Sequence, residues 1–339
     1  MKQGQGMKLL IGAGGIYCSF LTYGKLHEQI FKYTADDGSR FTYAFFLQVM
    51  ESLVTVVVAA VGLWRAGRQQ GLPLHMFMRA GVSQVLAKAC TSLALAHSLS
   101  FPVVTLAKSG KMVPVMAGSI LLGGKSYSWK QYLSVAAIIA GTVIVTMDQK
   151  KGGGSGGGSD SWLGLAFILA SLTFDGVVGG MQSDIQNEAT AKLGARVAPW
   201  DMMFWMNLFM AGTAALFCAL PLNSSLQVVL PEGVVALQYC ERNPVVLQKI
   251  LLFAACSATG QAFIFYTISN FDPLTTTTIT TTRKVSSTVL SILTEGHSLS
   301  AVGWAGLTVA SAGISMEIVE KTGAGGAHFN AKAPAKKVT

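Results

Sequence analysis

Apolar residues gather in long stretches along the chain, and polar residues lie mostly in the short segments between them. Each stretch is about 20 residues long, which is the length that an α-helix needs to cross roughly 30 Å of hydrocarbon. The pattern therefore predicts an all-α membrane protein. Ten spans are expected, over residues 8–24, 42–63, 74–96, 101–123, 129–147, 162–182, 199–220, 247–269, 272–293 and 299–319.

Composition agrees with this pattern. The 339 residues are 51% hydrophobic and 12% charged, and a soluble domain usually carries about twice that charged fraction. The five cysteines have no metal-ligand spacing, so we expect neither a metal nor another cofactor. Lys and Arg are scattered over the connectors and one tail, so the net charge of +9 does not indicate a nucleic-acid partner.

The distribution of Lys and Arg predicts an orientation. If the N-terminus is cytosolic, thirteen of the 25 Lys and Arg lie in cytosolic connectors and ends, and seven lie on the opposite side. Cytosolic segments of membrane proteins carry the excess of positive charge. An even number of spans places both ends on one side, so we expect both termini in the cytosol.

Five cations remain, and they lie well inside predicted spans: Lys88, Lys108, Lys111, Arg283 and Lys284. Each costs roughly 2.5–3.5 kcal/mol at the middle of a membrane helix. Folding alone does not require such costs. We therefore expect these side chains to face water, a carboxylate or an anionic ligand.

The spacing of these cations predicts a shared cavity. Lys108 and Lys111 are three residues apart, so they project from one face of the fourth span. Arg283 and Lys284 are consecutive and diverge by about 100°, so both can flank one cavity. The stretch that leads to them reads TTTTITTTRK.

Threonines extend the polar face next to these cations. Lys284 shares a helical stripe with Thr277, Thr280 and Thr281, whose hydroxyls both donate and accept hydrogen bonds. The threonine run is weak evidence by itself, because threonine is also common where membrane helices pack together. Together with the two cations, it predicts a helix face that lines a cavity.

Structural roles remain as alternatives for some of these residues. Arg283 and Lys284 would reach the interface if their side chains extended along the helix, although both lie about half-way along their span. Lys88 would be neutralised by an acidic residue within the membrane, either Glu51 or Asp175.

The two halves of the chain show a weak internal repeat. An offset of 172 residues aligns Lys111 with Arg283 and Gly141 with Gly313. Two halves of five spans must insert with opposite topology, as in inverted-repeat transporters with a central site. The predicted segments are a first five-helix repeat at 1–150, a Gly/Ser linker at 151–160, a second five-helix repeat at 161–320 and a cytosolic tail at 321–339.

No catalytic motif is complete. The segment SILLGGKS at 119–126 resembles a phosphate-binding loop, but Ser119 stands where the first glycine belongs and a membrane span precedes it. The connectors contain no Ser/His/Asp set and no paired catalytic carboxylates. We therefore expect a protein that is not an enzyme.

Several segments carry a specific resemblance, which extends from about Tyr23 to Ala312. They are LAKSGKMVPVM at 106–116, LTFDG at 172–176, WDMMFWMNL at 200–208, GQAFIFYTISNF at 260–271 and TITTTRK at 278–284. Together they resemble the nucleotide-sugar transporter family, solute carrier family 35. The most similar branch is the B subfamily of UDP-galactose/UDP-glucose transporters of the endoplasmic reticulum.

The resemblance implies a ten-helix drug/metabolite transporter fold and the exchange of a nucleotide conjugate for a returning nucleotide. By similarity, Lys108, Lys111, Arg283 and Lys284 surround the nucleotide phosphates. Further matching positions are Tyr23 and Glu28 at the cavity mouth and Asn207, Gln261 and Tyr266 facing the cavity. The chain departs from the family at Val104 and at Glu51, where relatives often or sometimes carry Gln.

The expected function is therefore exchange of UDP-galactose or UDP-glucose for a nucleoside monophosphate. Exchange of ATP for ADP, or transport of the sulfate donor PAPS, are alternatives within the same fold. A receptor or scaffold that binds a lipid headgroup is an alternative from another class, since membrane lipid surrounds the chain.

The chain ends KKVT, which resembles a dilysine retrieval signal. Lys336 and Lys337 would bind coat machinery, and this predicts the endoplasmic-reticulum membrane, with the Golgi as the alternative.

Overall fold

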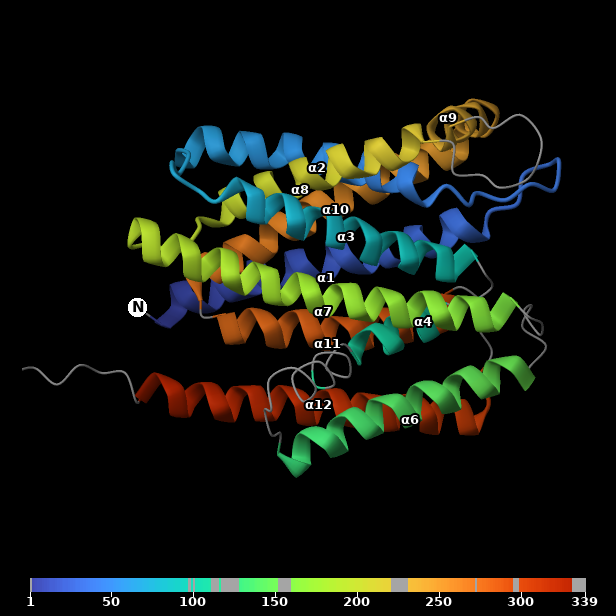
Figure 1. Cartoon of the computed structure of the whole chain (residues 1–339). Helices are drawn as coiled ribbons and strands as arrows, with labels where there is room; N and C mark the ends of the chain where they lie inside the picture. The colour runs from blue at the N-terminus through green and yellow to red at the C-terminus, as the bar shows by residue number, and fades with distance from the viewer. Residues whose placement is uncertain are drawn as a thin grey trace, which may run out of the picture.

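The structure is a computed structural model that describes residues 2–96, 99, 101–110, 116, 128–151, 160–220, 231–271, 273–294 and 299–330. The described chain is built from helices (Figure 1). Their bounds are α1 Lys2–Lys32, α2 Ala44–Ala66, α3 Leu74–Ala96, α4 Phe101–Ser109, α6 Trp129–Lys151, α7 Asp160–Leu193, α8 Pro199–Ala219, α9 Glu232–Arg242, α10 Pro244–Asn270, α11 Pro273–Thr294 and α12 Ala301–Asn330. Nine of the ten predicted spans overlap with one of these helices. Of the fourth, 101–123, the structure describes a helix over Phe101–Ser109, and most of the remainder lies outside the described residues.

Seven helices are long and apolar enough to cross a membrane, judged by length and composition over the described residues: α1, α2, α6, α7, α8, α10 and α12. The prediction of an all-α membrane protein is confirmed. Helices α3, α4 and α11 are not among the seven, and they carry the predicted cations Lys88, Lys108, Arg283 and Lys284. Helix α4 is described over only 9 residues, which is too short for this test. The count of ten spans stays a prediction.

The main packing contacts join helices from opposite sides of the linker. The closely packed pairs are α6 with α12, α3 with α7, α2 with α8, α1 with α10 and α4 with α11. Figure 1 shows these helices lying broadly along one direction, with α6 and α12 at one edge and α2 and α8 toward the other. If each of the first five spans (α1, α2, α3, α4 and α6) is exchanged for its counterpart among the last five (α7, α8, α10, α11 and α12), the same set of pairs results. Two structural repeats would produce this pattern. The division at 1–150 and 161–320 and the inverted insertion stay predictions.

Small residues bring α6 and α12 into backbone contact. A Cβ atom on Gly141 would lie 2.5 Å from both the Ala310 nitrogen and the Gly306 carbonyl oxygen. Ser134 Oγ donates a hydrogen bond of 2.8 Å to the carbonyl oxygen of Gly313. Such close approach is how membrane helices gain packing energy, because lipid tails provide no hydrophobic force between helices.

Helix α9 was not predicted from the sequence. It is 11 residues long and lies outside the ten apolar stretches, so hydropathy gave no signal for it. Its Glu232 carboxylate accepts hydrogen bonds from the backbone N–H groups of Phe45 (2.8 Å) and Phe46 (3.0 Å). These N–H groups lack partners within α2 because they belong to its first turn. Burial of Glu232 raises the pKa of its carboxyl group above the usual value.

Aromatic rings fill the end of the bundle next to α9. The ring of Phe31 lies 5.8 Å from that of Phe41, which in turn contacts Tyr43 at 5.3 Å and Tyr239 at 5.9 Å. These distances suit edge-to-face packing of rings. We call Phe31, Phe41, Tyr43 and Tyr239 the aromatic cluster. It joins α1, the α1–α2 connector and α9.

Candidate functional site

A cavity of about 370 Å³ lies between α1, α2, α3, α4, α7 and α11. Its volume is in the range of small-molecule sites, which hold about 300–1,000 Å³. Four cations line it: Lys88 from α3, Lys108 from α4, and Arg283 and Lys284 from α11. The structure thus brings together four of the five cations predicted within spans. The fifth, Lys111, lies outside the described residues.

Lys88 pairs with Glu51. Its Nζ atom lies 2.7 Å from Glu51 Oε1, and the carboxylate also accepts hydrogen bonds from Ser257 Oγ (2.6 Å) and Gln48 Nε2 (3.2 Å). Glu51 is 1% exposed and Lys88 is 20% exposed. Pairing with an intramembrane acid was left open from the sequence as an alternative for Lys88; the structure shows this pair, and the acid is Glu51 rather than Asp175.

Lys108 pairs with Asp175 across the cavity. Its Nζ atom lies 3.1 Å from Asp175 Oδ2 on α7 and donates a hydrogen bond of 2.8 Å to Thr91 Oγ1 on α3. Ser171, one turn before Asp175, continues this network through a contact of 2.8 Å between its Oγ and Thr91 Oγ1. Asp175 was named from the sequence only as a possible partner of Lys88. The sequence feature that could have pointed to its pairing with Lys108 is that Asp175 is an acidic residue inside a predicted span.

Arg283 and Lys284 form the α11 wall of the cavity. The guanidinium carbon of Arg283 lies 4.5 Å from the centre of the Phe20 ring, a cation–π contact. Arg283 Nε is buried, and it has no hydrogen-bond partner among the described residues. Lys284 Nζ donates a hydrogen bond of 3.3 Å to the carbonyl oxygen of Lys108. Arg283 therefore contacts Phe20 and has one buried donor that no described residue satisfies.

The threonine stripe lies beside the cavity. Thr280 and Thr281 are half-buried and are not among the residues that line it, and the Thr277 side chain lies outside what the structure describes. The neighbouring Thr282 hydroxyl accepts a hydrogen bond of 2.8 Å from Tyr17 of α1. Thr282 thus connects α11 to α1.

The residues named by resemblance divide into two groups. Tyr23 lines the cavity and stacks on Phe253 with ring centres 4.2 Å apart. Glu28 is buried outside the lining, where it pairs with Lys32 at 2.8 Å and accepts a hydrogen bond of 2.5 Å from Ser291 Oγ. Its position therefore differs from the cavity mouth expected for it.

Asn207 and Gln261 lie behind the cavity wall. Asn207 Nδ2 donates to Gln261 Oε1 at 3.2 Å, and Gln261 Nε2 donates to Ser257 Oγ at 3.4 Å. Ser257 in turn donates to Glu51, so this chain of hydrogen bonds supports the Lys88 ion pair. Tyr266 is likewise not among the lining residues.

Aromatic rings lie between the cavity and the end of the bundle at α9. His27 lines the cavity, and its ring lies 5.5 Å from that of Phe31, the first member of the cluster. From Phe31 the rings follow one another to the end of the bundle at α9. Packed rings therefore separate the cations from this end.

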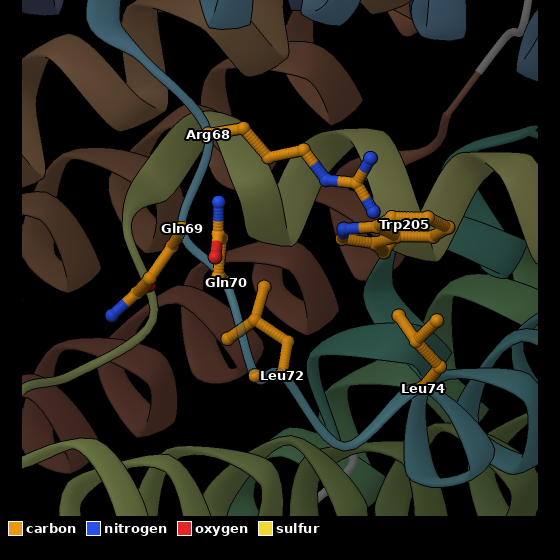
Figure 2. A pocket seen from close by; sticks show the side chains of 7 residues that line it. Arg68, Gln69, Gln70, Leu72, Leu74 and Trp205 are labelled. Carbon is orange, nitrogen blue, oxygen red and sulfur yellow. The ribbon is translucent and has the colours of Figure 1, made fainter.

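A second pocket lies at the opposite end of α2 (Figure 2). It has about 350 Å³, and Arg68 extends over the Trp205 ring with its guanidinium carbon 4.7 Å from the ring centre. Gln69 fastens the same connector to α8, because its backbone N–H donates to Asp201 Oδ2 at 3.2 Å and its side chain accepts from the Ala198 N–H at 3.0 Å. The lining has a single cation, so this pocket is the weaker site for an anion.

Comparisons with known proteins agree with this picture. Residues 8–321 match the UAA transporter family. The chain belongs to this family. It is 32% identical to UDP-galactose/UDP-glucose transporter 3 of Arabidopsis thaliana, over 91% of the chain and 90% of that protein. It is 29% identical to the solute carrier family 35 member B1 homolog of Drosophila melanogaster, over 92% and 90%.

A third relative carries a different name. The chain is 30% identical to adenosine 3'-phospho 5'-phosphosulfate transporter 1 of Homo sapiens, over 93% of the chain and 70% of that protein. These matches confirm the resemblance to nucleotide-sugar transporters. The protein is a multi-pass membrane transporter and not an enzyme.

Proposed function

We propose that the protein exchanges UDP-galactose or UDP-glucose for a nucleoside monophosphate across the endoplasmic-reticulum membrane, by alternating access to the central cavity. The observation that carries this proposal is a cavity inside a membrane bundle that is lined by Lys88, Lys108, Arg283 and Lys284. A cavity lined mainly by cations favours an anionic ligand, because ammonium and guanidinium groups form strong charge-assisted hydrogen bonds to phosphate oxygens.

The charge of the cavity favours a diphosphate sugar. The four cations are offset by the carboxylates of Glu51 and Asp175, which leaves two net positive charges among the described residues. A UDP-hexose and a nucleoside monophosphate each carry about two negative charges at neutral pH. Lys111, outside the described residues, would add a third positive charge. The name of the Arabidopsis thaliana relative supports the same cargo.

Transport of an adenine nucleotide or of the sulfate donor is the second candidate. The observation in its favour is the name of the Homo sapiens relative, at 30% identity. These nucleotides carry more negative charge than a UDP-hexose, so they would leave the cavity with an excess of negative charge unless further cations take part.

The test is exchange by the purified protein in liposomes loaded with UMP. Labelled UDP-galactose is taken up while unlabelled UDP-glucose, UMP, ATP, ADP or the sulfate donor competes from outside. We expect UDP-glucose and UMP to compete strongly. Competition by ATP and ADP without competition by uridine nucleotides would establish an adenine-nucleotide exchanger. If no nucleotide is exchanged, the receptor or lipid-binding alternative replaces transport of nucleotides.

Arg283→Ala links this activity to the cavity. A hydrogen bond to a charged group contributes about 1.5–3 kcal/mol, so its loss lowers exchange by roughly 10- to 150-fold. Arg242→Ala is the matched control, because Arg242 is exposed in the last turn of α9. Equal exchange by both variants would place the substrate elsewhere.

A further inference from the structure

Asp175 is the only acidic residue among the described residues that line the cavity. Its carboxylate is 19% exposed and lies 3.1 Å from the Nζ atom of Lys108, which is 23% exposed. In the described part of the chain, Lys108 is the one ion-pair partner of Asp175. A carboxylate in a site for anions repels the cargo, so its presence there requires a reason.

The pair with Glu51 provides a contrast. Glu51 is 1% exposed and accepts hydrogen bonds from Lys88, Ser257 and Gln48. Separating that pair would leave a buried charge without a partner. The Lys108–Asp175 pair faces the cavity, where water or a ligand replaces a lost partner, so it opens at much lower cost.

The Lys108–Asp175 pair also joins the two halves of the chain. Lys108 belongs to α4, before the linker, and Asp175 belongs to α7, after it. Among the described residues, other packing between α4 and α7 is slight, since α4 packs mainly on α11 and α7 mainly on α3. The ion pair is thus a specific link between helices that otherwise scarcely touch.

A substrate phosphate offers Lys108 the same kind of acceptor as a carboxylate. Both are anionic oxygens that take charge-assisted hydrogen bonds from an ammonium group. Lys108 Nζ already donates to Thr91 Oγ1 and touches Asp175 from within the cavity lining. A phosphate that binds Lys108 therefore competes with Asp175 for it.

We propose that Asp175 holds Lys108 in the empty cavity as a stand-in for the substrate phosphate, and that the incoming phosphate displaces it. This inference rests on the proposed exchange of nucleotides. It makes Asp175 a positioning residue that affects both the affinity for substrate and the coupling of substrate binding to the change of open side. While the pair is closed, α4 and α7 stay linked and the empty carrier does not change its open side. When phosphate takes Lys108, the link opens and the loaded carrier is free to move.

The first test measures binding. Dissociation constants for UMP and UDP-galactose are obtained with purified protein from ligand-induced thermal stabilisation. Asp175→Asn removes the competing charge, so we expect a dissociation constant on the order of threefold to tenfold lower. Asp36→Asn is the matched control, because Asp36 is exposed in the α1–α2 connector. Unchanged or weaker binding by a folded Asp175→Asn protein would overturn the proposal.

The second test asks whether Asp175 acts through Lys108. Lys108→Met is combined with Asp175→Asn, and the four dissociation constants form a double-mutant cycle. We expect Asp175→Asn to tighten binding in the wild-type background and to have little effect once Lys108 is Met. An equal gain in both backgrounds would show general charge repulsion and would overturn displacement at Lys108.

The third test measures coupling. Uptake of labelled UDP-galactose into liposomes without internal nucleotide is compared with uptake into UMP-loaded liposomes. We expect wild-type protein to need internal UMP, and Asp175→Asn to raise uptake into empty liposomes several-fold. The same ratio for both proteins would overturn the coupling role. Failure of the wild type to exchange any uridine nucleotide would instead refute the proposed cargo.

Discussion

Glu51 is 1% exposed and accepts three hydrogen bonds next to the cavity, so its removal gives a strong test of the structure. Three groups donate to it: Lys88 Nζ at 2.7 Å, Ser257 Oγ at 2.6 Å and Gln48 Nε2 at 3.2 Å. Glu51→Ala leaves the Lys88 ammonium without its counter-ion and leaves two polar groups in the wall without an acceptor. Each consequence destabilises the folded protein.

The expected loss follows from burial. Removing one partner of a buried ion pair costs about 3–5 kcal/mol, mainly because the remaining charge is uncompensated. Lys88 is 20% exposed toward the cavity, so water there hydrates it in part. We therefore expect the lower end of this range, about 3 kcal/mol, for the free energy of unfolding.

The assay is equilibrium unfolding of the purified variants in one detergent, with thermal unfolding as a second measurement. Glu188→Ala is the matched control. Its ion pair with Lys192 has the same N–O distance of 2.7 Å, but the Glu188 side chain is 38% exposed. Exposed pairs contribute little, so this variant should unfold close to wild type.

A double variant separates the lost charge pair from lost packing. Glu51→Leu with Lys88→Met replaces both charges by apolar side chains, which is often neutral or stabilising for a buried pair. We expect it to recover most of the stability that Glu51→Ala loses. If the free energy of unfolding of Glu51→Ala equals that of Glu188→Ala, the burial and pairing of Glu51 are wrong.

Three further changes test other parts of the molecule. Gly141→Ala should lower the free energy of unfolding by about 1–3 kcal/mol, because its Cβ would clash with α12. Gly212→Ala is the control, because its Cβ would meet nothing within 4 Å. Equal free energies of unfolding for the two variants would contradict the close approach of α6 and α12. Lys111→Ala should abolish nucleotide exchange while the protein stays folded and inserted, and normal exchange would remove Lys111 from the site. Replacing Lys336 and Lys337 by Ser should let a fluorescent fusion reach the Golgi, and an unchanged distribution would show that retention resides elsewhere.

The sequence by itself predicted the long apolar helices and showed which residues within them needed an explanation. A run of about 20 apolar residues predicts a membrane-spanning helix whatever its neighbours are. The reason is that a helix pairs all its backbone N–H and C=O groups within its own segment, as lipid requires. The cost of a cation within a span is equally local, so Lys88, Lys108, Arg283 and Lys284 stood out before any fold was known. All four line the cavity.

Only the tertiary structure decided which charges meet. Glu51 and Asp175 were equal candidates for Lys88, because helical periodicity orients a side chain on its own helix but does not say which helix lies opposite. Packing of α3 beside α2 and α7 assigns Glu51 to Lys88 and leaves Asp175 to Lys108. No property of the separate segments predicted that choice.

The same limit explains the residues that were placed differently from expectation. Resemblance expected Glu28, Asn207 and Gln261 at the cavity, and none of the three is among its lining residues. Glu28 bonds to Lys32 and Ser291, Asn207 bonds to Gln261, and Gln261 bonds to Ser257. Helix α9 went unpredicted because a short connector helix has no long apolar run to mark it. The sequence determines the spans and the buried charges through local costs. The partners of these charges and the walls of the cavity depend on how helices from both halves pack, which is set by contacts between residues far apart in the chain.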